Sequence, residues 1–433
     1  MRIAMIGAGY VGLVSGVCFS DFGHDVVCVD KDPRKISALR EGRVPIFEPG
    51  LEKMLAANAA AGRLTFSDTL AAAVAEADAV FIAVGTPTRR GEGQADLSFV
   101  YAAARELAAA LRGYTVVVVK STVPVGTNRE VQRIIGEANP NADFDVASNP
   151  EFLREGAAIE DFMRPDRVVV GAETERSEQT MRLLYSPLSL RETPMVVTTL
   201  ESAELIKYAS NAFLATKITF INEMADLCER CGADVQDVAR GMGLDGRIGS
   251  KFLHPGPGFG GSCFPKDLLA LARTGQAVNQ PMRIAETVLS VNDARKRAMA
   301  EKIIGAFDGV AGKRIAVFGV TFKPNTDDMR DAPSLTIVPA LVGAGGTIVV
   351  CDPEGRREGE PLLPGVGWEE DPFDAARDAD GVVLITEWNM FRGVDLARLR
   401  GVMRGAILVD LRNVYDSATA SAAGFDYTAV GRG

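Results

Sequence analysis

A short apolar segment, a glycine-containing turn and a helix-forming segment follow one another at the start of this chain, and the same order returns from residue 312. The first copy has a strand candidate at residues 2–6, a glycine turn and a helical stretch to residue 22. The second copy has strand candidates at residues 313–319 and 347–352. Strands that alternate with helices form a parallel sheet covered on both faces. The pattern predicts an α/β fold with two doubly wound, Rossmann-like domains.

More apolar segments of strand length complete both predicted sheets. They are residues 25–30, 79–84, 115–120, 144–147 and 167–170 in the first half, and 381–386 and 406–410 in the second. Ala-rich helical stretches, such as residues 70–76 and 100–111, lie between them.

The segment between the two predicted sheets is helical. Residues 201–230 contain neither Gly nor Pro, and their apolar residues recur at helical spacing. A helix of about 30 residues is about 45 Å long, which suits a bridge between domains or a subunit interface. We therefore expect a cofactor domain at 1–200, a central helical and dimerisation domain at 201–300, and a C-terminal α/β domain at 301–433.

Composition excludes several classes of function. The 47 Lys and Arg against 57 Asp and Glu give a net charge of −10, which disfavours nucleic acid or an anionic membrane as the partner. With only two histidines, a three-histidine zinc site is impossible, and no metal is expected. Six cysteines in 433 residues are too few for a disulfide framework, so a reducing cytoplasm is expected. The uncharged run 3–20 is interrupted by glycines and is interpreted as strand, turn and helix, not as a signal or membrane segment.

The first turn has the spacing of a dinucleotide-binding fingerprint. Its candidate cofactor residues are Gly7, Gly9, Tyr10, Val11 and Gly12. Glycines there permit a tight turn and a close approach to pyrophosphate, and the following helix start favours negative charge. Asp30 ends the second predicted strand, where a carboxylate accepts hydrogen bonds from ribose hydroxyls and repels a 2′-phosphate, so NAD is predicted. Lys35 is either a ribose contact or a solvated lysine.

Two further loops follow predicted strands at the edge where ligands bind in open α/β sheets. They carry Gly85, Thr86 and Pro87, and Ser121 and Thr122. These residues are candidates for the nicotinamide side of the cofactor, or else ordinary turn residues and caps.

Cys263 is the candidate nucleophile. It lies in a glycine loop that exposes backbone N–H groups, and Lys266 and Asp267 follow it. Donors and a cation beside a thiol favour the nucleophilic thiolate. Cys18, Cys28 and Cys351 are interpreted as small buried hydrophobic residues. The pair at 228 and 231 has no second pair or nearby histidine, so a metal or redox role is not expected.

Lys207 and Asn211 are four residues apart on the predicted long helix and therefore share a face. A cation and an amide together suit a developing oxyanion. A rim lysine beside a buried asparagine is the alternative.

Taken together, these motifs resemble the UDP-glucose/GDP-mannose dehydrogenase family essentially from end to end. The segments that carry the resemblance are GAGYVG at 7–12, NPEFLREG at 149–156, GFGGSCFPKD at 258–267 and DLR at 410–412. The resemblance implies two successive oxidations of UDP-glucose to UDP-glucuronate by two NAD⁺, through a thiohemiacetal and a thioester on Cys263.

The resemblance also assigns roles to residues. It implies that Lys207 and Asn211 stabilise oxyanions and that Asp267 holds a water or acts as a base. Glu151 and Thr122 match positions for water and proton transfer, while Glu155 matches a position near cofactor and sugar. Lys266 and Arg330 match cofactor positions. Substrate-site matches are Glu151, Phe152, Leu153, Arg154, Glu155, Lys207, Asn211, Phe252, His254, Gly256, Phe259, Gly260, Phe322, Lys323 and Arg412.

Arg247 matches a family position that reaches the substrate of a neighbouring subunit, so a homodimer is implied. The alternatives are a sister enzyme acting on GDP-mannose or a UDP-aminosugar, and a non-catalytic NAD-binding scaffold. Ser262 and Phe264 favour UDP-glucose over the sister substrates. A scaffold would not need Cys263 together with Lys207, and it is therefore disfavoured.

Overall fold

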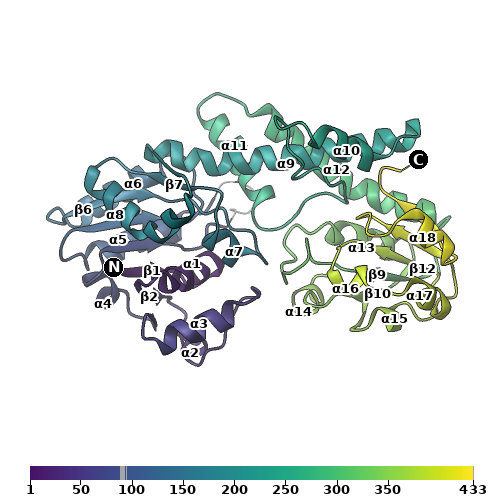
Figure 1. The fold of residues 1–433 in the computed structure, drawn as a ribbon, viewed down its shortest axis with the longest axis horizontal. Coiled ribbons are helices and arrows are strands. Elements are labelled where there is room, and N and C mark those ends of the chain that lie inside the picture. Colours follow the sequence, from purple (N-terminus) through teal and green to yellow (C-terminus); the bar gives the residue numbers. More distant parts are fainter. Residues whose placement is uncertain (88–92, 94, 433) are drawn as a thin grey trace. The chain divides into compact units, whose positions relative to one another are not determined.

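The computed structural model describes residues 1–87, 93 and 95–432 (Figure 1). They form two compact units. Unit 1 consists of Met1–Ser210 with Arg273–Val278, and unit 2 consists of Asn211–Ala272 with the chain from Asn279 onward. No helix among the described residues has the length and apolar character needed to cross a membrane.

Unit 1 contains a sheet in the order β3-β2-β1-β4-β5-β6-β7-β8. Its strands are β1 (Arg2–Ile6), β2 (Asp25–Val29), β3 (Leu64–Ser67), β4 (Ala79–Ile82), β5 (Thr115–Val119), β6 (Phe144–Ser148), β7 (Val168–Gly171) and β8 (Met195–Thr198). The chain order reverses at β1, which has β2 on one side and β4 on the other, as in dinucleotide-binding folds. The predicted doubly wound sheet is confirmed here.

One part of the prediction for this sheet is wrong, because the sheet is not parallel throughout. β7 pairs with β6 in the antiparallel direction, and β8 is parallel to β7, so the last two strands run opposite to the others. An apolar strand segment has the same residue pattern in either direction, so the sequence did not reveal this reversal.

Side chains of β1 alternate between two cores. Ile3 and Met5 pack with α1, α3 and α7, whereas Ala4 and Ile6 pack with α4, α5 and α6 on the opposite face. The helices of this unit are α1 (Tyr10–Asp21), α2 (Pro33–Arg40), α3 (Leu51–Ala60), α4 (Leu70–Ala75), α5 (Ser98–Ala108), α6 (Thr127–Ala138), α7 (Ala158–Met163) and α8 (Glu175–Leu184), with the 3₁₀ helix η1 (Ser186–Arg191). Helices on both faces explain why the strands are apolar at nearly every position.

Unit 2 has a six-stranded parallel sheet in the order β11-β10-β9-β12-β13-β14. The strands are β9 (Arg314–Phe318), β10 (Thr347–Cys351), β11 (Gly367–Glu369), β12 (Gly381–Leu384), β13 (Ile407–Asp410) and β14 (Asp426–Ala429). Ile315 and Val317 pack with α12 and α13, while Ala316 and Phe318 pack with α15, α16, α17 and α18. The second α/β domain is therefore confirmed.

The helix predicted at 201–230 is α9 (Leu200–Cys231), one continuous helix of 32 residues. Its first turns belong to unit 1 and the remainder to unit 2. The other helices are α10 (Val235–Gly243), α11 (Phe264–Ala277), α12 (Arg283–Ala306), α13 (Ser334–Gly343), α14 (Arg356–Gly359), α15 (Pro372–Ala375), α16 (Asn389–Arg392), α17 (Leu396–Val402) and α18 (Ser417–Ala422). α11 begins at Phe264, so the glycine loop that contains Cys263 ends at Cys263 itself.

Candidate active site

The fingerprint turn has the backbone geometry that its glycines predict. Gly7 follows β1 with φ of +100°, and a Cβ there would lie 2.6 Å from the carbonyl oxygen of Ala83. Only glycine fits this left-handed, closely packed position. α1 then begins at Tyr10, and no side chain of the described residues caps it. The uncapped helix start leaves backbone N–H groups for an anion.

Asp30 lies beside this turn, as predicted. One carboxylate oxygen accepts from the N–H of Ala8 at 2.9 Å and from Nζ of Lys35 at 2.9 Å. Burial alone raises the pKa of Asp30, but these hydrogen bonds and that from the N–H of Asp32 outweigh burial and lower it. Asp30 is therefore a carboxylate at neutral pH. Lys35 holds Asp30 in place, whether or not it also contacts ribose.

The loops after β4 and β5 are brought together at the same sheet edge. Thr86 donates its hydroxyl to the carbonyl of Thr122 at 3.0 Å, and Ser121 donates to the carbonyl of Val84 at 2.7 Å. The parallel register of β1, β4 and β5 places their ends side by side. Gly85 and Pro87 lie in the first of these loops.

Glu151 and Lys207 form a buried ion pair. The Lys207 ammonium is 3.0 Å from one Glu151 oxygen, and the two residues are 3% and 7% exposed respectively. The other Glu151 oxygen accepts from the N–H of Leu153. Two cations lie near the ring of Phe152, with the Arg167 guanidinium 3.7 Å and the Lys207 ammonium 5.4 Å from the ring centre. The structure thus joins two residues that are 56 positions apart.

Arg154 and Glu155 continue this segment. Arg154 forms an ion pair with Asp161 at 2.6 Å, and its side chain is mostly exposed. Glu155 directly precedes Gly156, whose N–H donates to Glu48 at 2.7 Å.

Glu48 was missed by the sequence analysis. This buried carboxylate accepts from the N–H of Ala158 at 2.8 Å and from the hydroxyl of Tyr10. It therefore joins the fingerprint helix to the segment that contains Glu155. Burial and this hydrogen bond raise the pKa of Tyr10, which stays a phenol. An acid flanked by Phe47 and Pro49 in a loop was the available signal. Its partner Tyr10 is 38 residues away, and its backbone partners at 156 and 158 are more than 100 residues away.

Unit 2 contains a second buried polar group. Asn211 donates from Nδ2 to one oxygen of Asp267 at 2.7 Å, and Lys266 lies 2.8 Å from the other oxygen. Asp267 is 1% exposed. Cys263 is half-buried and directly precedes α11, and its carbonyl accepts from the N–H of Asp267 at 2.8 Å. The Ser262 hydroxyl lies 3.5 Å from the Cys263 sulfur. The nucleophile candidate and the Asn211–Asp267 pair therefore share the start of one helix.

The loop before Cys263 is held at several points. Phe259 exchanges two hydrogen bonds with the Asn292 amide, at 2.8 and 3.0 Å. Gly260 follows it, and the N–H of Gly261 donates to the carbonyl of Arg330 at 2.8 Å. Gly261 has φ of +82°, and a Cβ there would lie 2.7 Å from the Phe322 ring, so only glycine fits. The loop is therefore fixed by the Asn292 side chain of α12 and by the segment between β9 and α13.

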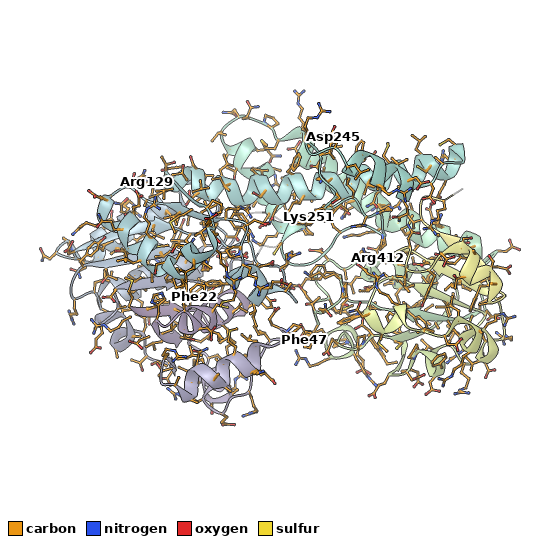
Figure 2. The ribbon with its side chains drawn as sticks, viewed as in Figure 1. Phe22, Phe47, Arg129, Asp245, Lys251 and Arg412 are labelled. Carbon is orange, nitrogen blue, oxygen red and sulfur yellow. The ribbon has the colours of Figure 1, made fainter. Side chains whose placement is uncertain are left out.

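Among the cationic candidates of unit 2, Arg412 lies against the loop before Cys263, whereas Arg330 and Lys323 contact neighbours in their own segment. Arg412, labelled in Figure 2, donates to the carbonyl of Ile385 at 2.8 Å and lies against Gly256, so it belongs to the loop. Arg330 pairs with Asp328 at 2.8 Å. Lys323 lies 5.4 Å from the centre of the Phe322 ring.

Arg247 and His254 have exposed side chains. The Arg247 side chain is 90% exposed and pairs with Asp245. His254, a substrate-site match in the sequence, is also exposed. Phe252 has φ of +66°, an uncommon backbone conformation for a phenylalanine, and its ring packs against Phe264.

The cysteines differ in environment as predicted. Cys18, Cys28, Cys228 and Cys351 are buried, Cys231 is exposed, and all six are free thiols. Burial raises the pKa of Cys28 to about 12. Among the described residues, no group of three or more His, Cys, Asp or Glu side chains is placed to hold a metal ion.

Comparisons with known proteins agree with this geometry. Three models of the UDP-glucose/GDP-mannose dehydrogenase family match the chain: the NAD binding domain over residues 1–189, the central domain over 201–294, and the UDP binding domain over 316–417. NAD is therefore the cofactor.

The chain is 62% identical to UDP-glucose 6-dehydrogenase of Rhizobium meliloti strain 1021, over 100% of both chains. It is 44% identical to UDP-glucose 6-dehydrogenase TuaD of Bacillus subtilis strain 168, over 100% of this chain and 93% of the relative. The solved structure of a UDP-glucose dehydrogenase from Pyrobaculum islandicum is similar with a TM-score of 0.90 and 41% identity, over 98% of this chain and 96% of that one.

Proposed function

The chain belongs to the UDP-glucose/GDP-mannose dehydrogenase family, and we propose that it oxidises UDP-glucose to UDP-glucuronate with two NAD⁺ per sugar. The observation that carries this proposal is the pairing of Glu151 with Lys207 and of Asn211 with Asp267, with Cys263 at the start of α11. A nucleophile, a buried cation and a fixed amide are the groups that oxidation through a thioester requires.

The turn at 7–12 fits the cofactor, because its packing leaves room for no side chain at Gly7 and its helix start is uncapped. NAD⁺, when bound, accepts the hydride removed from the sugar carbon. Tyr10 and Val11 begin the helix that would face its pyrophosphate, and Asp30 would accept hydrogen bonds from its ribose. Lys266, Glu155 and Arg330 are proposed as further contacts, by family resemblance.

Cys263 provides the covalent step. Removal of a hydride and a proton turns the primary alcohol into an aldehyde, and the Cys263 thiol adds to its carbonyl to give a thiohemiacetal. Loss of a second hydride and a proton makes a thioester. Water then breaks the carbon–sulfur bond, which releases a carboxylate and restores the thiol. The covalent bond holds the reacting carbon in place from the aldehyde stage through the second oxidation until water releases the product.

The buried polar side chains are proposed to stabilise the negative charge that develops on the sugar oxygen. Lys207 and Asn211 would stabilise the oxyanion of each tetrahedral state. Asp267 orients Asn211 and can hold the water or accept its proton. Glu151 and Thr122 are proposed to position the water for thioester hydrolysis.

The nucleotide of the substrate is assigned to the second α/β domain, since the UDP binding model matches residues 316–417. Phe322, Lys323 and Arg412 supply a ring and two cations for a nucleoside diphosphate. The sugar would lie against the loop of Phe252, His254, Gly256, Phe259 and Gly260, and against the segment of Phe152, Leu153 and Arg154.

A homodimer is supported by an apolar stripe on α9. Phe213, Phe220 and Leu227 are spaced seven residues apart and are 65%, 44% and 54% exposed. Residues at that spacing lie on one helix face, as in helix–helix interfaces. A second copy of the chain would cover this stripe by two-fold symmetry and could supply Arg247. The cytoplasm is the proposed compartment, since all six thiols are free.

The test is to compare kcat/KM for UDP-glucose, GDP-mannose and UDP-N-acetylmannosamine, each with NAD⁺, by the absorbance of NADH. The proposal predicts that UDP-glucose exceeds both others by about 100-fold or more, about 3 kcal/mol of discrimination. A preference for another sugar would assign the chain to a sister activity. If none of the three sugar nucleotides yields NADH, the proposal is contradicted and the chain is an NAD-binding protein without this activity.

A further inference from the structure

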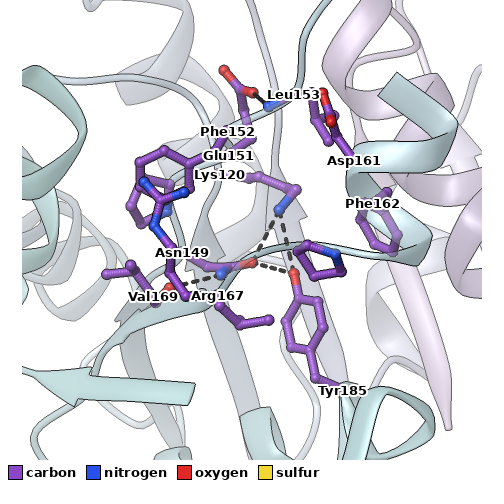
Figure 3. A pocket seen from close by; sticks show the side chains of 13 residues that line it. Lys120, Asn149, Glu151, Phe152, Leu153, Asp161, Phe162, Arg167, Val169 and Tyr185 are labelled. Atoms are coloured by element: carbon purple, nitrogen blue, oxygen red, sulfur yellow. Dashed lines mark hydrogen bonds between the residues drawn. The ribbon is translucent and has the colours of Figure 1, made fainter. Parts of the chain in front are cut away.

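One buried lysine has no part in the chemistry described so far. Lys120 directly follows β5 and is 3% exposed. Its ammonium donates to Oδ1 of Asn149 at 3.1 Å and to the hydroxyl of Tyr185 at 3.3 Å. Figure 3 shows these hydrogen bonds at the centre of a pocket that Glu151 also lines. The lysine thus joins the ends of β5 and β6 to the residue that follows α8.

The charge of Lys120 is held by neutral partners. Among the described residues, no carboxylate forms an ion pair with it, and burial lowers its pKa from 10.5 to about 8. Three further titratable groups act on it at longer range: Glu151 favours its charged form and so does Cys18, while Lys207 disfavours it.

Two other charged groups line the same pocket. Asp161 is paired with Arg154, and Arg167 is stacked on the Phe152 ring. An unpaired buried ammonium costs folding free energy. The reason for a lysine at position 120 is therefore sought in the activity and not in the stability of the protein.

The partner of Lys120 is the first residue of the segment that carries Glu151. Asn149 also donates from Nδ2 to the carbonyl of Val169 at 2.9 Å, and its N–H donates to the carbonyl of Val119 at 3.0 Å. Pro150, with its fixed φ, is the only residue between Asn149 and Glu151. The position of Asn149 therefore largely determines where the Glu151 carboxylate meets Lys207.

We propose that Lys120 is a positioning residue for the oxidation: its buried ammonium fixes Asn149 and attracts Glu151, and so holds the Glu151 carboxylate opposite Lys207. The inference rests on the proposed function, in which Glu151 acts on the thioester. A charged donor makes a stronger hydrogen bond than a neutral one. The attraction between Lys120 and Glu151 acts between two buried side chains, where charges are screened less than at the surface.

The first test is Lys120→Met, which keeps the length of the side chain and removes its charge. The hydrogen bond from the Tyr185 hydroxyl to Asn149, at 2.6 Å, survives this change. We therefore expect a higher melting temperature at pH 7, because no polar group loses its only partner and an unpaired charge disappears. We expect kcat to fall about 10- to 100-fold, as for a misplaced catalytic group, with KM for NAD⁺ unchanged.

The melting temperature also has a defined pH dependence. The lysine has a lower pKa when folded, so the unfolded chain binds more protons between pH 8 and 10.5. The stability of the wild type should rise relative to Lys120→Met across this window, as the cost of the buried charge disappears. The matched control is Tyr185→Phe, which keeps the ammonium and should keep kcat within about threefold.

A double-mutant cycle with Glu151→Gln tests whether Lys120 acts through Glu151. The inference predicts that Lys120→Met costs little further activity in the Glu151→Gln background. If Lys120→Met does not fold, Asn149→Ser tests the same link and should also be non-additive with Glu151→Gln.

Two results would overturn the inference: a kcat for Lys120→Met equal to that of the wild type, or losses that multiply in the double variant. The wild-type control keeps the two proposals apart. No NADH from the wild type with UDP-glucose would contradict the proposed function, whereas an active wild type with an equally active Lys120→Met would contradict only the role of Lys120.

Discussion

At the scale of single residues, the six thiols differ mainly in where the fold places them. Four are buried, and burial raises the pKa of a thiol. The pKa of Cys351, for example, is raised to about 12. Cys263 is the one half-buried cysteine of the six, and it directly precedes a 14-residue helix. The start of a helix carries partial positive charge, which favours a thiolate. Its position in the fold is thus what distinguishes Cys263 as the proposed nucleophile from the other five cysteines.

Cys263→Ala should therefore abolish formation of UDP-glucuronate while leaving NAD⁺ binding intact, because the cofactor turn lies elsewhere in the chain. The measurements are product formation by chromatography and NAD⁺ affinity by calorimetry. Cys231→Ala, at the exposed cysteine, is the control and should retain full activity. Undiminished turnover in Cys263→Ala would show that another group carries the covalent step.

At the scale of elements, α9 does more than connect the units. Glu204, near its start, accepts from the N–H groups of Gly126 and Asn128 at 2.7 and 2.8 Å and from the Asn128 side chain at 2.6 Å. It therefore caps α6 just after the loop that contains Ser121 and Thr122. One helix thus fixes that loop through Glu204 and contributes Lys207 one turn later.

Glu204→Ala should lower the free energy of unfolding by about 2–4 kcal/mol, because three buried donors lose their acceptor. Glu201→Ala is the matched control on the same helix. Its ion pair with Arg129 is exposed, so its loss should cost about 1 kcal/mol or less. Urea denaturation followed by circular dichroism measures both. Equal costs for the two variants would contradict the capping role of Glu204.

The elements also show what the sequence could predict. Periodicity and glycine placement predicted β1, α1, β9 and the 32-residue α9, because these signals are local. The direction of β7 and β8 depends on pairing between distant segments and was missed. β3, with the sequence LTFS, alternates buried and more exposed positions, so it lacks the continuous apolar run by which four-residue strands such as β4 were predicted.

The candidate site also has features that local sequence signals predict and features that depend on contacts between distant residues. Glycine spacing and the loop around Cys263 predicted the candidate segments directly, because these signals are local in the sequence. The contacts within the site join residues 56 positions apart, as in the pairs of Glu151 with Lys207 and of Asn211 with Asp267. Lys120 and Glu48 were missed because a single charged residue at the end of a strand or in a loop is usually exposed.

At the scale of the whole molecule, the apolar stripe of Phe213, Phe220 and Leu227 predicts an assembly of two copies. Phe213→Asp places a charge in that stripe at a side chain that is 65% exposed, so the fold should tolerate it. We expect a monomer in analytical ultracentrifugation and a loss of activity, since Arg247 of a second copy would no longer reach the substrate.

Leu190→Asp is the control for this prediction. Leu190 is 90% exposed on η1, outside the stripe, and its replacement should change neither mass nor activity. A Phe213→Asp variant that keeps the mass and activity of the wild type would place the interface elsewhere.

The central claim is that one sugar carbon is oxidised twice, the second time while it is bound to the Cys263 thiol. The most direct test is the number of NADH produced per UDP-glucose consumed by the wild-type protein, with UDP-glucose limiting and the product identified. We expect two NADH for each UDP-glucose, with UDP-glucuronate as the product and no free aldehyde. One NADH for each UDP-glucose, with the aldehyde as the product, would contradict the thioester on Cys263.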